Sequence, residues 1–303
     1  MVPIGVFMYR QPGSFYQGRR LPRPDEEVTD QGLGFDLGTL LARRRVLQAF
    51  GTGAAVLGVA ACTGSPTTGS GTAASGTTGS GAASSTAASA AASPPALTEI
   101  PDETQGPFPG DGSNGPDILE RSGVIRSDVR ANLDGTSTAD GVRLEIELTV
   151  ISLTGNGQPL VGAAVYIWQC DKAGRYSMYS AGVTRDTFLR GVQITDRAGR
   201  VGFTSVFPGC YPGRWPHVHF EVYPDRAAIA DHSTVVKTSQ LAFPEDVGKL
   251  VYREAGYRQS TENLAGVTLD TDMVFRDDHA VTQTATMTGS VSAGYRATLA
   301  VGV

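Results

Sequence analysis

The sequence has little histidine, cysteine or charge for its length. Its 303 residues include four histidines, three cysteines and two tryptophans, and 18% of them are charged. The apolar stretch at residues 46–62 is too short, and too rich in Ala and Gly, to span a bilayer permanently. Residues 62–303 also lack a basic cluster that could neutralise a run of phosphates, which argues against a nucleic-acid partner.

Residues 63–96 contain no charged and no aromatic side chain. This Thr, Gly, Ser and Ala sequence cannot bury enough apolar surface to offset the entropy of ordering it, so we expect a low-complexity, flexible linker. Residues 97–303 remain, which is ample length for one well-buried core. We therefore predict a single folded domain after the linker.

The segment ahead of the linker has the pattern of an export signal. RRRVLQ at residues 43–48 resembles a twin-arginine signal, and VAAC at 59–62 resembles a lipobox, in which Cys62 becomes the lipidated first residue. We interpret residues 1–62 as a signal and expect an exported protein, attached to the membrane only through lipid. A plain hydrophobic helix and a signal cleaved without lipidation are the alternatives.

Removing this signal changes the charge and the cysteine count of the chain. Residues 62–303 carry 18 basic and 25 acidic residues, a net charge of −7. Cys170 and Cys210 then remain as an even pair in an oxidising compartment, and we predict a disulfide between them. The alternative is a pair of buried free thiols.

Alternating apolar and polar residues predict an all-β domain. In VRLEIELTVI, residues 142–151, every second side chain is apolar, which is the period of a half-buried strand. No long helical period occurs after residue 97. We expect an antiparallel β-sandwich with short helices in its loops. Further strands are predicted within 163–170, 195–207, 215–224 and 285–303, and short helices within 119–125 and 244–256.

Two of the four histidines lie in GCYPGRWPHVHF, residues 209–220. Side chains two apart in a strand project from one face, so His217 and His219 would lie close enough to share a metal ion. This pattern is weak by itself, because alternating polar residues on a solvent face look the same. His232 and His279 stand alone among Asp and Ser, and we expect both on the surface.

Two tyrosines strengthen the prediction of a metal site. Tyr211 lies in the Pro- and Gly-rich turn PGCYPG, and Tyr176 follows the DKAG turn after the predicted strand 163–170. Two phenolates and a hydroxide would cancel the charge of Fe(III), a hard ion that favours anionic oxygen. Zinc would favour Cys, His and carboxylate instead. Each tyrosine could alternatively be a rim residue with its hydroxyl in water.

Three motifs resemble the intradiol ring-cleaving dioxygenases, the ferric catechol and protocatechuate dioxygenases. They are W-x5-G-x-Y at Trp168–Tyr176, Y-P ahead of R-x-P-H-x-H at Tyr211–His219, and G-P-F-P at Gly106–Pro109. The resemblance spans roughly residues 98–280. It implies a non-haem Fe(III) site and two residues that line the substrate. The implied iron ligands are Tyr176, Tyr211, His217 and His219, and the implied substrate-lining residues are Arg214 and Gln240.

The resemblance also implies a reaction. A catechol-type aromatic would be cleaved by O2 between its two hydroxylated carbons to a cis,cis-muconate, in the breakdown of aromatic compounds at the cell surface. Tyr211 would leave the iron and serve as a base, Arg214 would stabilise negative charge, and Gln240 would help to orient the complex. Trp215 departs from the alanine found in many members, and the helical dimerisation region of the catechol enzymes is missing. The oligomeric state, including a homo-oligomer, stays open.

Three alternatives to an active dioxygenase differ in how well they fit the sequence. A non-catalytic, lipid-anchored β-sandwich binding module fits the signal, the linker and the fold equally well, but it leaves the two tyrosines, the HxH pair and the arginine without a role. The same domain could also have kept its fold and lost its activity, although no ligand position is substituted. A hydrolase is not supported, because the sequence has no G-x-S-x-G elbow.

Overall fold

The computed structural model describes residues 15–16, 19–20 and 97–303. The first four of these residues form strands β1 (Phe15–Tyr16) and β2 (Arg19–Arg20), which pair antiparallel. The rest of the predicted signal, including Cys62, and the whole predicted linker at 63–96 lie outside the described residues. No helix of the described part is long and apolar enough to cross a membrane.

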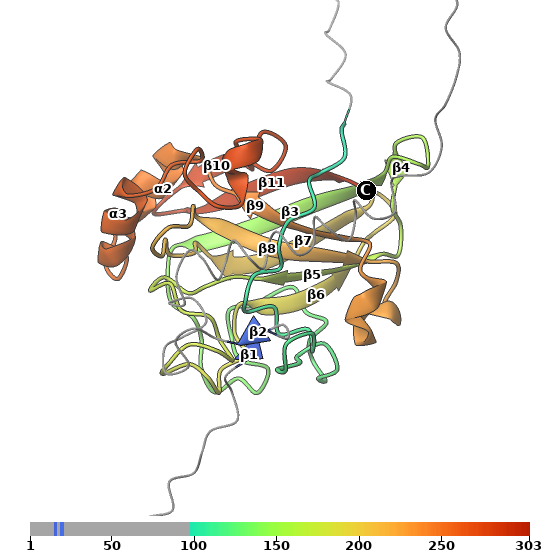
Figure 1. Cartoon of the computed structure of the whole chain (residues 1–303), viewed down its shortest axis with the longest axis horizontal. Coiled ribbons are helices and arrows are strands. Elements are labelled where there is room, and N and C mark those ends of the chain that lie inside the picture. Colours follow the sequence, from blue (N-terminus) through green and yellow to red (C-terminus); the bar gives the residue numbers. More distant parts are fainter. Residues whose placement is uncertain (1–14, 17–18, 21–96) are drawn as a thin grey trace, which may run out of the picture. The chain divides into compact units, whose positions relative to one another are not determined.

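Residues 97–303 form two sheets, as the sequence predicts (Figure 1). A five-stranded sheet contains β3 (Arg143–Ser152), β4 (Gln158–Pro159), β7 (Arg200–Val206), β10 (Thr286–Ser290) and β11 (Gly294–Gly302). A four-stranded sheet, in the order β6-β5-β8-β9, contains β6 (Arg190–Ile194), β5 (Ala164–Trp168), β8 (His217–Tyr223) and β9 (Lys237–Ala242).

The core lies between the two sheets. Strand β3 shows the predicted alternation, because Leu144, Ile146, Leu148 and Val150 are buried in one apolar cluster while the residues between them are at least partly exposed. The same cluster receives every second residue of β5 and β8 from the other sheet. The β-sandwich is therefore confirmed, and apolar side chains from facing strands hold the sheets together.

One strand pair is parallel rather than antiparallel. The segment 285–303 folds into the hairpin β10–β11, and β11 then runs parallel to β3, with Leu299 opposite Leu148. The other strand pairs of the described domain are antiparallel. The predicted antiparallel sandwich thus contains one parallel pair, which the sequence did not indicate because alternation shows which face a strand buries and not its direction.

Two helices lie at one end of the sandwich. Helix α2 (Glu245–Val251) falls within the predicted segment 244–256, whereas α3 (Arg258–Ala265) was not predicted. The predicted helix at 119–125 was wrong. Val124 instead accepts a backbone hydrogen bond from Val192 of β6, and its neighbour Gly123 has a positive φ of 87° that interrupts a helix.

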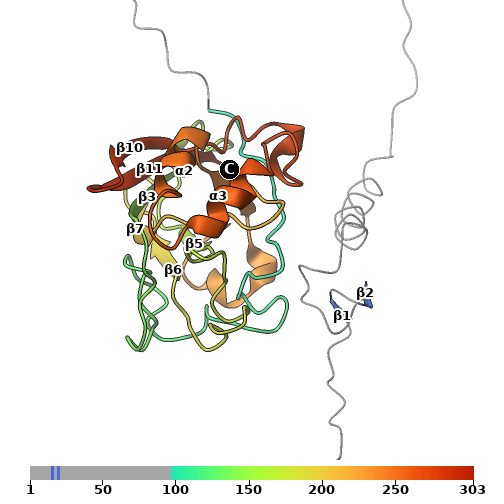
Figure 2. The same cartoon turned by 90° about the vertical axis from the view of Figure 1, so that its left-hand side faces the viewer.

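The outer face of the four-stranded sheet is covered by loops. A second apolar cluster joins the outward side chains of β5, Ala164, Tyr166 and Trp168, to the loop residues Ile118 and Tyr176. These loops, coloured teal to yellow-green, extend beyond β6 (Figure 2). The four-stranded sheet is therefore buried on both faces.

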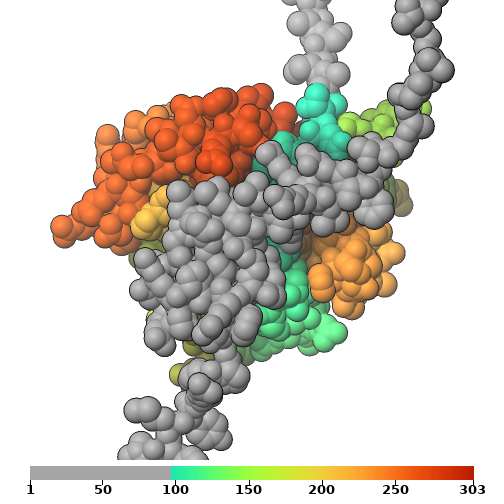
Figure 3. Space-filling view, viewed as in Figure 1, coloured from blue at the N-terminus to red at the C-terminus, as the bar shows by residue number. Residues whose placement is uncertain are grey.

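In the space-filling view the C-terminal segments, orange to red, form a continuous surface over the α2–α3 end (Figure 3).

Candidate functional site

The predicted histidine pair lies on the loop-covered face of β8. Val218, Phe220 and Val222 point into the core between the sheets. His217 and His219 alternate with them and are buried, with 2% and 3% of their surface exposed. A strand buried on both faces explains why this polar pair is not a solvent face, which was the alternative interpretation.

The two predicted tyrosines come from neighbouring loops whose backbones touch. Gly209 donates its backbone N–H to Asp171 O at 3.0 Å. A Cβ at Gly209 would lie only 2.8 Å from Lys172 O and 2.9 Å from Gly174 N, so this approach requires glycine. The contact brings the loop before Tyr211 against the loop before Tyr176.

The four side chains converge on one point of the sheet. Tyr176 Oη lies 3.4 Å from Tyr211 Oη and 3.4 Å from His217 Nε2. Tyr211 Oη lies 3.2 Å from His217 Nε2, and the Nε2 atoms of the two histidines are 3.1 Å apart. The structure thus places all four predicted ligands together.

These distances fit a cluster of metal donors. Atoms held about 2.1 Å from one ion lie roughly 3.0 to 3.4 Å from one another in tetrahedral or octahedral arrangements. In the described part of the chain no group of three or more His, Cys, Asp and Glu side chains could hold a metal ion. A cation here would therefore depend on the two phenol oxygens as well as the imidazoles.

Burial sets the protonation state of the four donors. Burial and the positive charge of Arg214 lower the pKa of His217 to about 3, and burial with the neighbouring His217 holds the pKa of His219 well below its usual value. Both imidazoles are neutral and can donate a lone pair. Burial raises the pKa of Tyr211 to about 12 and holds that of Tyr176 well above its usual value, so a strongly charged cation would be needed to ionise both phenols.

Arg214 and Gln240 lie beside the donors, where the resemblance placed them. Gln240 stands opposite His219 in the β8–β9 register and is fully buried. Arg214 Nη2 donates to Gln240 Oε1 at 2.5 Å, and Arg214 Nε donates to Asp272 Oδ2 at 3.0 Å. Gln240 Nε2 donates in turn to Thr104 O at 2.9 Å.

The segment Gly106–Pro109 covers this face of the site. A Cβ on Gly106 would lie 3.3 Å from His219 Cε1, and the ring of Phe108 lies 4.9 Å from that of Tyr176. The fully buried Arg190 holds the segment by donating to Phe108 O at 2.9 Å and Pro109 O at 2.6 Å. Sequence reasoning missed Arg190, because nothing local marks a β6 residue as the anchor of a distant loop.

Trp168 is fully buried in the second apolar cluster, and its indole lies against the site. Cross-strand pairing puts it opposite His219, and the two rings stack with centroids 4.8 Å apart and planes 6° apart. Trp215, which stands where many members of the resembled family have alanine, points away from the site. Its indole belongs to the cluster between the sheets, and its Nε1 donates to Phe243 O at 2.8 Å. The bulky residue is thus accommodated in the core.

The predicted disulfide is not present. Cys170 and Cys210 are both free and buried. Their sulfur atoms point to different carbonyl groups, Cys170 Sγ donating to Gly209 O at 3.4 Å and Cys210 Sγ to Arg214 O at 3.3 Å. Burial raises the pKa of both thiols, that of Cys210 to about 12, so neither is a reactive thiolate. The alternative interpretation, two buried small thiols, describes this structure.

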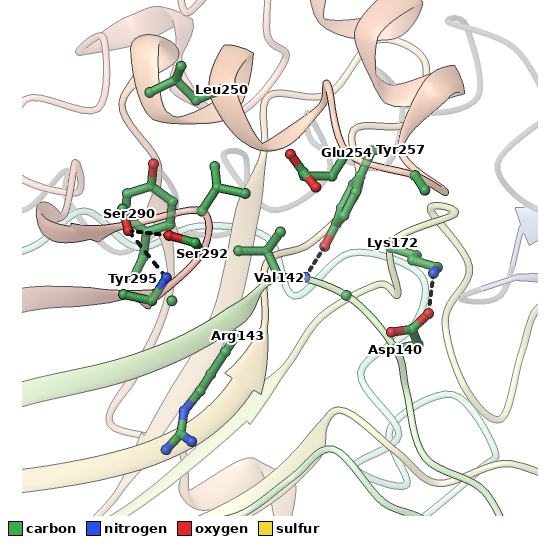
Figure 4. A pocket seen from close by; sticks show the side chains of 15 residues that line it. Asp140, Val142, Arg143, Lys172, Leu250, Glu254, Tyr257, Ser290, Ser292 and Tyr295 are labelled. Atoms are coloured by element: carbon green, nitrogen blue, oxygen red, sulfur yellow. Dashed lines mark hydrogen bonds and ion pairs between the residues drawn. The ribbon is translucent and has the colours of Figure 1, made fainter.

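A separate surface pocket of about 980 Å³ lies where β3 begins, beside α2 and the β10–β11 turn (Figure 4). Lys172 pairs with Asp140 on one side of it, and Val142 N donates to Tyr257 Oη at 3.1 Å. None of the four donors lines this pocket. His232 and His279 are exposed, as predicted. The candidate functional site is therefore the cluster of Tyr176, Tyr211, His217 and His219, and not this pocket.

The fold and the site define a β-sandwich protein with a buried cluster of two tyrosines and two histidines. Residues 113–247 match the family Dioxygenase_C, described as "Dioxygenase". The chain is similar in structure to an intradiol ring-cleavage dioxygenase from Tetranychus urticae, with a TM-score of 0.54 and 25% identity, over 68% of this chain and 94% of that one. These findings support the intradiol ring-cleaving dioxygenase family.

Curated relatives match over shorter segments. A hydroxyquinol 1,2-dioxygenase of Rhizobium sp. (strain MTP-10005) is 34% identical over 73 residues, 24% of this chain and 25% of that protein. A catechol 1,2-dioxygenase of Candida albicans is 41% identical over 56 residues, 18% of each chain. The matches thus span a quarter or less of the length of these two relatives. They support ring-cleaving oxidoreductase chemistry as the general kind of reaction.

Proposed function

We propose that residues 97–303 form a non-haem Fe(III) intradiol dioxygenase that cleaves catechol-type aromatics with O2 to cis,cis-muconate-type products. The observation that carries this proposal is the convergence of two phenol oxygens and two neutral imidazole nitrogens, 3.1 to 3.4 Å apart, with no carboxylate among them. Phenolate oxygen is the aromatic donor that suits ferric iron. The names of the relatives support a catechol-type substrate.

Tyr176, Tyr211, His217 and His219 would hold the ion. When bound, ferric iron would supply Lewis acidity that favours the ionised catechol and its reaction with O2. Tyr211 is partly exposed whereas Tyr176 is buried, so Tyr211 Oη is the better placed of the two to accept a proton from an entering substrate hydroxyl. Tyr176, packed against Phe108, would keep its place.

Arg214 is the cation placed to stabilise negative charge that develops on the substrate. Its guanidinium interacts electrostatically with both tyrosines, and Gln240 fixes one of its nitrogens. The covering segment Gly106–Pro109 would exclude water from this face. In the overall reaction the bond between the two hydroxylated carbons breaks, and each of these carbons gains one oxygen atom of O2, so both atoms appear in the dicarboxylate product.

The test is a visible absorption spectrum of the purified full chain, before and after anaerobic addition of catechol, followed by O2. A ferric tyrosinate site gives a broad visible band that shifts to longer wavelength with catechol, and O2 then yields muconate. A protein that stays colourless after iron is supplied contradicts the proposal. The non-catalytic surface binding module would then become the leading hypothesis.

A further inference from the structure

Asp272 is a buried carboxylate beside the site, and neither the sequence motifs nor the matched segment 113–247 includes it. Its side chain is 0% exposed. Oδ1 accepts the backbone N–H groups of Val274 at 2.8 Å and Phe275 at 3.0 Å. Oδ2 accepts Arg214 Nε at 3.0 Å and Trp215 N at 2.6 Å. Four donors therefore fix this carboxylate in one position.

The same contacts fix the guanidinium of Arg214. Nε is held by Asp272 and Nη2 by Gln240, while Nη1 has no hydrogen-bond partner among residues 97–303. The guanidinium also lies over the ring of Phe275, with Cζ 5.9 Å from the ring centroid. A planar guanidinium held at two nitrogens and one face cannot rotate, so the direction of its third nitrogen is determined.

We propose that Asp272 is a positioning residue for ring cleavage, which directs Arg214 Nη1 toward the substrate beside the four donors. This inference rests on the proposed dioxygenase function and adds a residue to it. The polar chain Asp272–Arg214–Gln240–Thr104 runs from the C-terminal segment, across β9, to a residue two positions before the covering segment. This chain of contacts fixes Arg214, which is the only cationic side chain of the described domain that bonds to the side chain of Gln240.

The position of the pair argues for more than a stabilising role. Replacing a buried ion pair by apolar side chains is often neutral or stabilising, so stability alone gives little reason to keep one. A guanidinium oriented before the substrate arrives has no reorganisation to undergo during the reaction. Asp272 meets this requirement because its backbone partners, Val274 and Phe275, hold it independently of Arg214.

The test is Asp272→Asn in the iron-loaded full chain. Asparagine preserves the shape, but its amide group cannot accept from both Arg214 Nε and the backbone donors. We expect iron content, the visible band and the anaerobic affinity for catechol to stay close to wild type. We expect kcat to fall about ten- to a hundredfold, with a smaller change in KM. Asp128→Asn is the matched control, because Asp128 also accepts a backbone N–H and an arginine fork, from Arg130, away from the donors.

A double-mutant cycle separates positioning from a general structural effect. If Asp272 acts through Arg214, D272N should change kcat by less than about twofold in an Arg214→Lys background, because the two effects are not additive. A fully additive loss would overturn the proposal. So would a D272N single variant with wild-type kcat.

Two further outcomes are also decisive. If D272N does not fold, Arg214→Lys and Arg214→Met carry the test. Lysine keeps the charge but not the fork, so both variants should lose similar turnover, and a lysine variant with near wild-type kcat would contradict the proposal. If the wild-type chain itself shows no visible band and no turnover, the proposed function fails, and this inference with it. Wild-type turnover with an unaffected D272N removes the positioning role alone.

Discussion

His217 and His219 lie on the same face of β8, yet different contacts hold them. His217 Nδ1 lies 2.5 Å from Trp215 O, a contact that leaves Nε2 free to ligate. His219 Nδ1 is buried and has no hydrogen-bond partner among residues 97–303, and the ring is instead stacked on Trp168. One imidazole is therefore oriented by a hydrogen bond and the other by an aromatic neighbour.

Removing a donor should weaken metal binding without unfolding the domain. We expect His219→Ala to weaken iron binding by at least about a hundredfold, because three donors remain of four. Iron retained after dialysis against a chelator, together with the visible band, measures this. The matched control is His232→Ala, an exposed histidine outside the site, which should retain iron like the wild type. Equal retention by both variants would show that His219 is not a ligand.

Glu103 predicts a pH dependence of stability. Burial, with the nearby carboxylates of Asp277 and Asp278, raises the pKa of Glu103 to about 8, although Gln283 and Arg214 oppose the shift. The folded state therefore binds a proton that the unfolded state has released above its ordinary pKa of 4.5. This contribution to stability is complete below pH 4.5 and is lost as pH rises to about 8.

The variant Glu103→Gln should remove that dependence. We expect it to be more stable than wild type by on the order of 2 kcal/mol at pH 8.5, and nearly equal at pH 4.5, since solvent access and relaxation reduce the full linkage effect. Urea unfolding of the two chains at both pH values measures the difference. A constant difference across this range would mean that Glu103 does not titrate there.

For single residues, the sequence indicated those whose chemistry is unusual for their place in the chain. Two tyrosines in turns and an HxH pair stand out along the chain itself. Trp168, Arg190 and Asp272 do not, because a tryptophan in an apolar strand, an arginine and an aspartate all have ordinary explanations. Their roles follow from strand register and from loops that meet in space, which no local pattern encodes.

Among the elements, the contact between the two tyrosine-bearing loops depends on a glycine. Gly209→Ala would push a methyl group against three backbone atoms, Lys172 O, Gly174 N and Asp171 O. We expect a loss of about 2 to 3 kcal/mol in the free energy of unfolding, with weaker iron retention, because backbone cannot move aside as a side-chain tip can. Thermal unfolding and iron content measure both effects.

Gly202→Ala is the control for this variant. Gly202 lies in β7, and a Cβ there would meet no atom within 4 Å. We expect this variant to match wild type or to gain up to about 1 kcal/mol, since alanine has less backbone entropy to lose in a strand. If both alanine variants behaved alike, the loop contact would not be the cause.

The strands that sequence reasoning found are those with clean alternation or uniform apolarity, such as β3 and β5. Strands β6 and β9 were missed because Arg190, Gln193, Lys237 and Gln240 make them look polar. Three of these four polar residues are needed where they are, since Arg190 and Gln240 serve the site and Lys237 binds two carboxylates. Polar residues that serve the site, or that bind the first residues of the domain, thus obscure the apolar–polar alternation of these two strands.

For the whole molecule, we propose export and lipid attachment, on the grounds of the motifs at residues 43–48 and 59–62. We expect Arg43→Lys with Arg44→Lys to leave the protein in the cytoplasm, and Cys62→Ser to block lipid attachment. Cell fractionation and radiolabelled fatty acid incorporation measure these outcomes. A double lysine variant that is still exported, or a labelled C62S variant, would contradict them. Neither change should alter the spectrum of the purified iron-loaded chain.

The first residues of the domain are tied down before the chain reaches the site. Ile100 N donates to Gly302 O, Lys237 Nζ binds Glu99 and Asp102, and Glu103 N donates to Thr238 O. Thr104, the next residue, bonds to Gln240. A mechanical pull arriving through residue 97 would have to break these contacts in turn before it displaced Gln240. Under a pull applied at residue 97, these contacts would therefore bear the load before the residues proposed to meet the substrate.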